Sequence, residues 1–262
     1  MQRPVLHAGP RKCNLVAGMS SDQSEAIIKA AGLLAHAVEH VRFAKPVRLT
    51  YNPLLYARIP HELYLGRYAA SPKRAVFLGM NPGPWGMAQT GVPFGEVAAV
   101  REWLGIVGAV AMPKRQHARV PVTGFECRRS EVSGRRLWGL MRERFGSGEE
   151  FSHHAFVANY CPLLFLDDAG RNLTPDKIAG NDKVRLYSLC DRFLTVVIET
   201  LRPEWLVGVG VFAAQRIRAV MQTLPAAAAG VVSIPHPSPA NPRANRDWAS
   251  QARAVLEREG VW

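Results

Sequence analysis

Four short, unbroken apolar segments, separated by longer amphipathic stretches, constrain the fold of this chain most strongly. The segments are AVFLG (Ala75–Gly79), AFVAN (Ala155–Asn159), WLVGV (Trp205–Val209) and VVSIP (Val231–Pro235). A strand that is apolar on both faces must be covered on both faces, which is typical of parallel sheets between helices. We therefore expect an α/β fold, a three-layer sandwich with a central four-stranded, mainly parallel sheet flanked by helices.

Apolar residues at helical spacing predict the helices that cover this sheet. The expected helices are Val97–Ile106, Arg135–Phe145, Asp182–Leu201, Val211–Met221 and Ala244–Glu259. An earlier helix begins near Asp22, which forms a capping pair with Glu25, and its apolar spacing continues towards Pro46. The aromatic stretch Leu49–Tyr68 is interrupted by prolines, so we expect packed irregular structure there.

The chain of 262 residues is long enough for one large domain. We expect a flexible basic leader over residues 1–20, a single domain over residues 21–262 and a short linker at Pro225–Gly230. The first residues lack the apolar core of a secretory signal, and no apolar run approaches the roughly 20 residues of a membrane span. The expected location is intracellular, in the cytoplasm or nucleoid of a bacterium or the nucleus of a eukaryote, and the expected state is a monomer.

The net charge of +12 and the pI near 10.1 favour a polyanionic partner, with nucleic acid as the leading class. Nine Lys and Arg residues against three Glu lie between Pro113 and Arg144. The basic residues are Lys114, Arg115, Arg119, Arg128, Arg129, Arg135, Arg136, Arg142 and Arg144. Part of this cluster faces phosphate, or the cluster is only a solvated surface.

Neither a metal centre nor a disulfide framework is predicted. The four cysteines, Cys13, Cys127, Cys161 and Cys190, are widely spaced and contain no C-x-x-C pair. His153 and His154 are adjacent, and we expect them on a strand, where neighbouring side chains point in opposite directions.

Ligands of open parallel sheets bind beyond the carboxyl ends of the strands. Three of the four expected strands are followed there by an Asn or a His next to a proline-constrained turn, namely Asn81, Asn159 and His236. A pair of carboxylates for acid and base work is absent from these loops, apart from Asp167 and Asp168, which lie several residues past Asn159. The stretch from Gly79 to Gly95 carries no charge, so it is either a tight linker or the wall of a pocket for a flat, neutral ligand.

An amide side chain offers a donor and an acceptor together, as the edge of a uracil-like base requires. Phe94 is held between Pro93 and Gly95 and offers a stacking face, although the spacing alone favours an ordinary core phenylalanine.

Six motifs, taken together, resemble one known family. They are GMNPGPWGMAQTGVPFGE, ECRRSEVSG, NYCPLLFL, GRNLTP, LVGVGVFAAQR and HPSPANPRAN. In order and spacing they are similar to the single-strand-selective monofunctional uracil-DNA glycosylases, of the uracil-DNA glycosylase superfamily, from about Tyr51 to Trp248. The resemblance implies hydrolysis of the N-glycosidic bond of uracil and 5-substituted uracils such as 5-hydroxymethyluracil. It implies single- and double-stranded DNA as partner, a role in base excision repair, and neither cofactor nor metal.

The same resemblance implies roles for individual residues. Asn81 would position the attacking water, and His236 would steady the negative charge that develops on the leaving base. Phe94 would stack on the flipped base and Asn159 would read its edge. Met80 and Gly83 would border the pocket, with Gly83 leaving space beside C5 of the pyrimidine.

DNA contacts are implied for two loops. Arg171 and Asn172 belong to the first, and the second is a wedge that contains Pro237, Ser238, Pro239, Ala240, Asn241 and Arg243. The chain departs from vertebrate members at Ala240, where they have Arg, and at Trp85, where they have Phe. Ala240 predicts weaker penetration of duplex DNA, which Arg243 would partly offset.

Two rival functions fit the same residues. One is a related glycosylase that acts mainly on deaminated purines such as xanthine and hypoxanthine. The other is a catalytically silent protein that binds damaged DNA.

Overall fold

The computed structural model describes residues 22–70, 72–224 and 228–262. Its main sheet contains β2 (Ala75–Gly79), β3 (Ala155–Asn159), β6 (Trp205–Val209) and β7 (Gly230–Ile234). The helices are α1 (Asp22–Glu39), α2 (Pro53–Tyr56), α3 (Arg58–Tyr68), α4 (Met87–Thr90), α5 (Val132–Phe145), α6 (Gly148–His154), α7 (Gly180–Leu201), α8 (Val211–Met221) and α9 (Trp248–Arg258). The predicted leader, residues 1–20, and residues 225–227 of the predicted linker lie outside the described residues.

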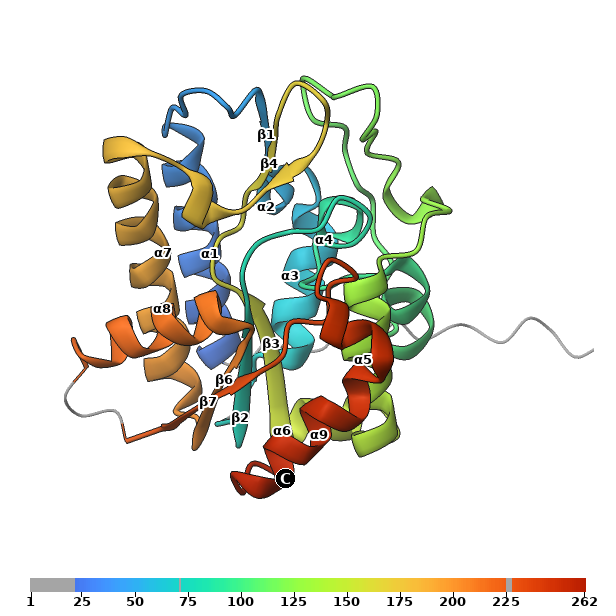
Figure 1. The fold of residues 1–262 in the computed structure, drawn as a ribbon, viewed down its shortest axis with the longest axis vertical. Coiled ribbons are helices and arrows are strands. Elements are labelled where there is room, and N and C mark those ends of the chain that lie inside the picture. Colours follow the sequence, from blue (N-terminus) through green and yellow to red (C-terminus); the bar gives the residue numbers. More distant parts are fainter. Residues whose placement is uncertain (1–21, 71, 225–227) are drawn as a thin grey trace, which may run out of the picture.

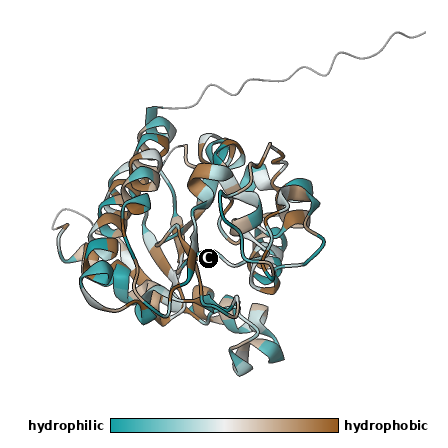
Figure 2. Ribbon diagram, turned by 90° about the horizontal axis from the view of Figure 1, so that it is seen from above, coloured by the Kyte–Doolittle hydropathy of each residue, from teal (hydrophilic) through white to brown (hydrophobic). Residues whose placement is uncertain are grey.

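The main sheet has the strand order β3-β2-β6-β7, and every neighbouring pair is parallel. Helices α1, α7 and α8 lie on one side of it, and α5 and α9 lie on the other (Figure 1). Figure 2 shows both apolar and polar colours on individual helices, as expected of amphipathic helices that cover a sheet. The predicted α/β fold with a four-stranded parallel sheet between helices is confirmed.

A second, three-stranded sheet was not predicted. It joins β1 (Leu49–Tyr51), β4 (Leu164–Leu166) and β5 (Asn172–Leu173) in antiparallel pairs in the order β1-β4-β5. Figure 1 shows β1 and β4 beyond the upper end of the main sheet, where β2 and β3 end. The small sheet therefore anchors the segments that follow β3 near the carboxyl edge of the main sheet.

Several predicted elements differ from the observed ones. The stretch Leu49–Tyr68 contains two helices, because Pro53 and Pro60 occupy first helical turns, where a missing N–H costs nothing. The predicted helix Val97–Ile106 is a five-residue π-helix, Ala99–Trp103, and α1 ends well before Pro46.

Helix boundaries differ elsewhere too. A 3₁₀ turn, Pro242–Arg246, precedes α9, so the last helix begins four residues later than predicted. His153 and His154 end helix α6 and do not lie on a strand, and His154 binds Glu150 one turn earlier. Across the described residues, no helix is both long and apolar enough to span a membrane.

Candidate active site

Strand register brings the predicted site residues together at the carboxyl edge of the main sheet. Gly79 at the end of β2 lies opposite Asn159 at the end of β3, and β7 ends two residues before His236. A cavity of about 380 Å³ opens at this edge. Its lining residues are Met80, Asn81, Gly83, Pro84, Phe94, Glu131, Ser133, Asn159, Asn172, Thr174, His236, Ser238 and Pro239.

Gly79 forms the floor beneath two of these side chains. A Cβ atom at Gly79 would lie 2.3 Å from Oδ1 of Asn159 and 2.4 Å from Cε2 of Phe94. Only a residue without a side chain lets both groups cross the end of β2. The pocket therefore requires a glycine as the last residue of β2, since any side chain there would displace Asn159 and Phe94.

Phe94 is held in a conformation that a buried aromatic residue rarely adopts. Its φ angle is 53°, in the left-handed region, and the residue is only 9% exposed. The indole Nε1 of Trp138 donates a hydrogen bond of 3.1 Å to the backbone carbonyl of Phe94. The centroid of the Phe94 ring lies 6.4 Å from that of the His236 ring. Strained backbone of this kind persists where the surroundings fix it, commonly at binding sites.

Asn159 carries an unsatisfied acceptor into the cavity. The residue is 8% exposed, and its Nδ2 lies 3.2 Å from the sulfur of Met87, whereas Oδ1 is buried without a hydrogen-bond partner among the described residues. A buried, unpaired carbonyl costs about 1–3 kcal/mol. A ligand edge with an N–H donor next to a carbonyl would satisfy both ends of this amide.

The amide of Asn81 is oriented by its neighbours. Its Nδ2 donates to the carbonyl oxygen of Leu163 at 3.2 Å and lies 3.5 Å from Oδ1 of Asn172. Because Nδ2 faces these acceptors, Oδ1 is left to accept a hydrogen bond from a water molecule. Asn172, expected at a DNA contact, lines the cavity, and its Nδ2 donates to the Pro82 carbonyl at 3.3 Å.

His236 is a neutral hydrogen-bond donor. The backbone N–H of Ser238 donates to its Nδ1 at 3.1 Å, so Nδ1 carries no proton and the neutral ring carries it on Nε2. Burial lowers the pKa of His236 to about 4. At neutral pH, the cavity therefore contains an uncharged Nε2–H group. Gly210, whose φ is 94°, leaves room for the imidazole, because a Cβ there would lie 3.2 Å from the Cβ of His236.

The cavity also contains a carboxylate, Glu131, which the loop sequences did not reveal. Glu131 precedes α5, and its Oε2 accepts a hydrogen bond from the backbone N–H of Trp85 at 3.4 Å. A Cβ at Gly83 would lie 2.3 Å from Oε2, so the glycine admits this carboxylate. Burial raises the pKa of Glu131, while backbone N–H groups of Trp85 and Ser133 oppose the rise. Glu131 lies outside the loops that follow the predicted strands, so the sequence alone did not single it out.

The predicted wedge loop is held by its own hydrogen bonds and by α5. Nη1 of Arg136 donates to the Pro237 carbonyl at 2.7 Å, and Nη2 donates to Oδ1 of Asn245 at 3.0 Å. Pro239 and Ala240 are exposed at the tip. Asn241 is half-buried, and its Nδ2 donates to the His236 carbonyl at 3.2 Å, which links the loop to the site. The side chain of Arg243 is outside the described part of the structure.

The other predicted DNA contact, Arg171, projects from a tight turn. Its Nε donates to Oδ2 of Asp167 at 2.7 Å, yet 80% of its side chain remains exposed. Hydrogen bonds from the turn, the Arg171 backbone N–H first among them, lower the pKa of Asp167. The guanidinium is thus fixed in direction and still faces solvent.

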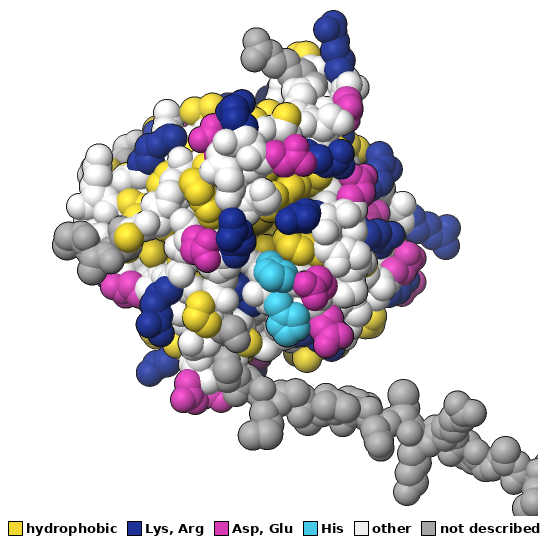
Figure 3. Space-filling view, turned by 90° about the horizontal axis from the view of Figure 1, so that it is seen from below, with side chains coloured by type: hydrophobic (Ala, Val, Ile, Leu, Met, Phe, Trp, Pro, Cys, Tyr) yellow, Lys and Arg dark blue, Asp and Glu magenta, His cyan; other side chains and the backbone are white. Residues whose placement is uncertain are grey.

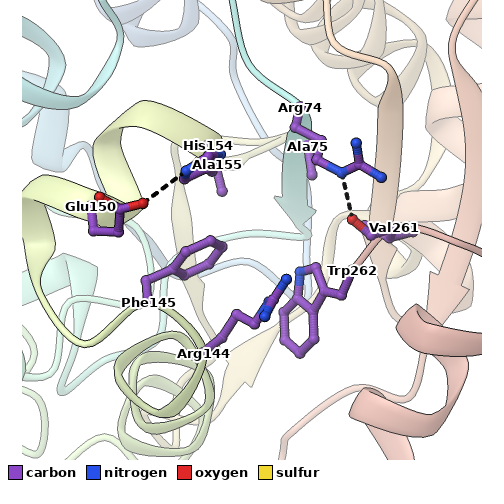
Figure 4. A pocket seen from close by; sticks show the side chains of 9 residues that line it. All are labelled: Arg74, Ala75, Arg144, Phe145, Glu150, His154, Ala155, Val261 and Trp262. Carbon is purple, nitrogen blue, oxygen red and sulfur yellow. Dashed lines mark hydrogen bonds and ion pairs between the residues drawn. The ribbon is translucent and has the colours of Figure 1, made fainter.

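A smaller cavity of about 150 Å³ lies at the opposite end of the sheet (Figure 4). Ala75 and Ala155, the first residues of β2 and β3, line it, together with Trp262. Figure 3 shows this end of the molecule, where basic and acidic side chains are interspersed. Because neither the predicted side chains nor the carboxyl ends of the strands lie there, the candidate site is the larger cavity.

A metal centre finds no ligands in the described ranges. No three His, Cys, Asp or Glu side chains gather there as a metal ion would require. Cys161 and Cys190 are buried and free, Cys127 is half-buried, and Cys13 lies outside the described residues.

Comparison with known proteins identifies the family. Residues 65–257 match the family model of the uracil DNA glycosylase superfamily. The single-strand selective monofunctional uracil-DNA glycosylases of Rattus norvegicus and Mus musculus are 47% and 46% identical to this chain over 224 residues, covering 86% of it and 80% of each relative. That of Bos taurus is 45% identical, covering 86% of this chain and 82% of its own.

A solved structure extends the likeness to the fold. The crystal structure of wild-type SMUG2 from Pedobacter heparinus is 15% identical, with a TM-score of 0.57, over 88% of this chain and 94% of the other. The motifs, the sequence identity and the arrangement of the sheet agree: the chain belongs to the uracil DNA glycosylase superfamily and, within it, to the family of single-strand selective monofunctional uracil-DNA glycosylases.

Proposed function

We propose that this protein is a monofunctional DNA glycosylase that flips uracil and 5-substituted uracils, such as 5-hydroxymethyluracil, out of DNA and hydrolyses the N-glycosidic bond. Single- and double-stranded DNA are its substrates, and it acts inside the cell as a monomer at the start of base excision repair. The observation that carries this proposal is the convergence of Asn81, Phe94, Asn159 and His236 in one cavity.

Recognition follows from the unsatisfied amide of Asn159. Its Oδ1 accepts the N3–H of uracil and its Nδ2 donates to O4, while Phe94 stacks on the ring. Cytosine presents an acceptor at N3 and a donor at the exocyclic amine, so both contacts become mismatched. The cost of leaving buried groups unpaired turns this mismatch into selectivity.

Hydrolysis follows from Asn81 and His236. As the bond from C1′ to N1 breaks, its electrons move to the base and positive charge develops on the sugar. The Nε2–H of His236 donates to O2 and stabilises the anionic base, and Oδ1 of Asn81 holds the water that attacks C1′. The water supplies the hydroxyl of the abasic sugar and releases its other proton to solvent, and the departing base takes up a proton from solvent.

A panel of substrates tests the proposed function. Single- and double-stranded oligonucleotides carrying uracil, 5-hydroxymethyluracil, xanthine or hypoxanthine are incubated with the protein, and abasic sites are assayed. We expect release of both pyrimidines. Release of only the purines would support the rival glycosylase, and binding without any release would support the silent damage binder.

A further inference from the structure

A cation stacked on an indole borders the candidate site. The guanidinium carbon of Arg129 lies 3.8 Å from the ring centroid of Trp85. Trp85 follows Pro84, which lines the cavity, and its backbone N–H is bonded to Glu131, which lines it too. The pair is thus fixed on the rim of the cavity.

The hydrogen-bond donors of Arg129 are unused within the described residues. Its guanidinium makes no ion pair and no hydrogen bond there, and the residue is exposed. Two other arginines of the same basic cluster are occupied: Arg136 binds the Pro237 carbonyl, and Arg119 binds the Ala169 carbonyl. Arg129 therefore combines a fixed plane with free N–H edges.

We propose that Arg129, held flat against Trp85, binds a backbone phosphate of the DNA strand that carries the flipped nucleotide. The proposal rests on the proposed function, because it takes the cavity to be the pocket for that nucleotide. A strand that delivers a base into the cavity must cross its rim, and every nucleotide brings a phosphate with it. The net charge of +12 favours such a partner.

Stacking suits a phosphate contact for two reasons. An arginine already confined to one plane loses less side-chain entropy when it binds, and the planar fork matches two phosphate oxygens. The indole also provides the strongest aromatic face for a cation. Because the guanidinium covers one face of Trp85, that face is not available to stack on a base.

The test measures binding to a short single-stranded oligonucleotide with one central uracil, in an Asn81→Ala background to slow excision. We expect Arg129→Ala to weaken binding about tenfold, as the loss of one charge-assisted contact does. The slope of log affinity against log salt should become shallower by about 0.7, the value for one phosphate of a single strand. Arg218→Ala, at an exposed arginine near the far end of α8, serves as the matched control and should change neither quantity.

Neutral linkages identify the phosphate. A methylphosphonate is placed at one position at a time on each side of the uracil, and each oligonucleotide is measured with both proteins. At one linkage, neutralising the phosphate should weaken DNA binding by the parent protein. The same neutral linkage should not weaken binding by the Arg129→Ala variant any further. Trp85→Ala should weaken binding by less than Arg129→Ala, because the arginine keeps its charge, and it should add no further loss to Arg129→Ala in the double variant. Circular dichroism checks that it folds. Arg129→Lys should lie between.

Three results would overturn the proposal. They are unchanged affinity and salt slope for Arg129→Ala, additive effects at every neutral linkage, or coupling to removal of a neighbouring base instead of to a phosphate. Uracil release by the protein with native Asn81 is measured separately. Coupling at one linkage without any uracil release would refute the proposed function and leave the phosphate contact standing. Uracil release without coupling at any linkage would support the proposed function and refute the phosphate contact.

Discussion

Gly79→Ala is the smallest change that should disable the site. A Cβ at this position would lie 2.3 Å from Oδ1 of Asn159 and 2.4 Å from Cε2 of Phe94, whereas ordinary contacts begin at 3.4 Å. Both side chains must therefore move by about 1 Å. A displacement of that size in a catalytic arrangement can cost about 100-fold in rate, and overpacking of a core typically costs about 1–3 kcal/mol of stability.

The assay for Gly79→Ala is single-turnover release of uracil at saturating protein, with thermal unfolding measured in parallel. Gly139→Ala is the matched control, since a Cβ at this position of α5 meets nothing within 4 Å. We expect the control to be as active and at least as stable as the native chain, because alanine favours a helix over glycine. Native rates of uracil release by Gly79→Ala would refute the role given to the floor of the cavity.

Four further variants or conditions test separate parts of the protein. Because burial lowers the pKa of His236 to about 4, single-turnover release should not fall as the pH rises from about 5 to about 8, whereas a charged imidazolium would lose activity over that range. Burial also lowers the pKa of His61 to about 4, so between about pH 4 and about pH 6.5 the unfolded chain binds more protons at this residue than the folded chain does. Stability in urea should therefore fall as the pH falls through this window, by up to about 1.4 kcal/mol per pH unit for His61. Asn159→Asp should weaken discrimination between uracil and cytosine, because an acceptor-only carboxylate no longer donates to O4; unchanged selectivity in a competition assay would argue against its role. Arg136→Ala removes the two bonds that hold the wedge loop, so release from duplex DNA should fall more than release from single strands; equal losses, or the same effect from Arg135→Ala, would contradict this.

The main sheet could be predicted because each of its strands is a short apolar run that is visible in the local sequence. Three of the four predicted strands have the observed bounds, since each apolar run is cut off by a glycine, a proline, an asparagine or a charged residue. The small sheet could not be predicted, because β4 and β5 contain three and two residues, too few for a periodic pattern. The prolines of α2 and α3 misled the prediction, because a proline in a first turn begins a helix and does not break one.

The polar residues of the site followed from the position of the strands, whereas their partners did not. Asn159 ends β3, and Asn81 and His236 each come two residues after the end of a strand, so the topology alone places them together. Glu131 enters the cavity from before α5, and Arg136 reaches the wedge loop across 101 residues of sequence. No local pattern marks either contact. The protonation of His236 also required the structure, because it depends on which ring nitrogen the Ser238 N–H contacts.

The most direct test of the account separates chemistry from binding. Single-turnover release of uracil from a single-stranded oligonucleotide is compared for the native chain, Asn81→Ala and His236→Ala, with the affinity of each protein measured on the same DNA. Each variant should lose about 100-fold or more in rate, as the loss of one group that stabilises a transition state does, with DNA affinity little changed. Full excision of uracil by both variants would contradict the assignment of the site.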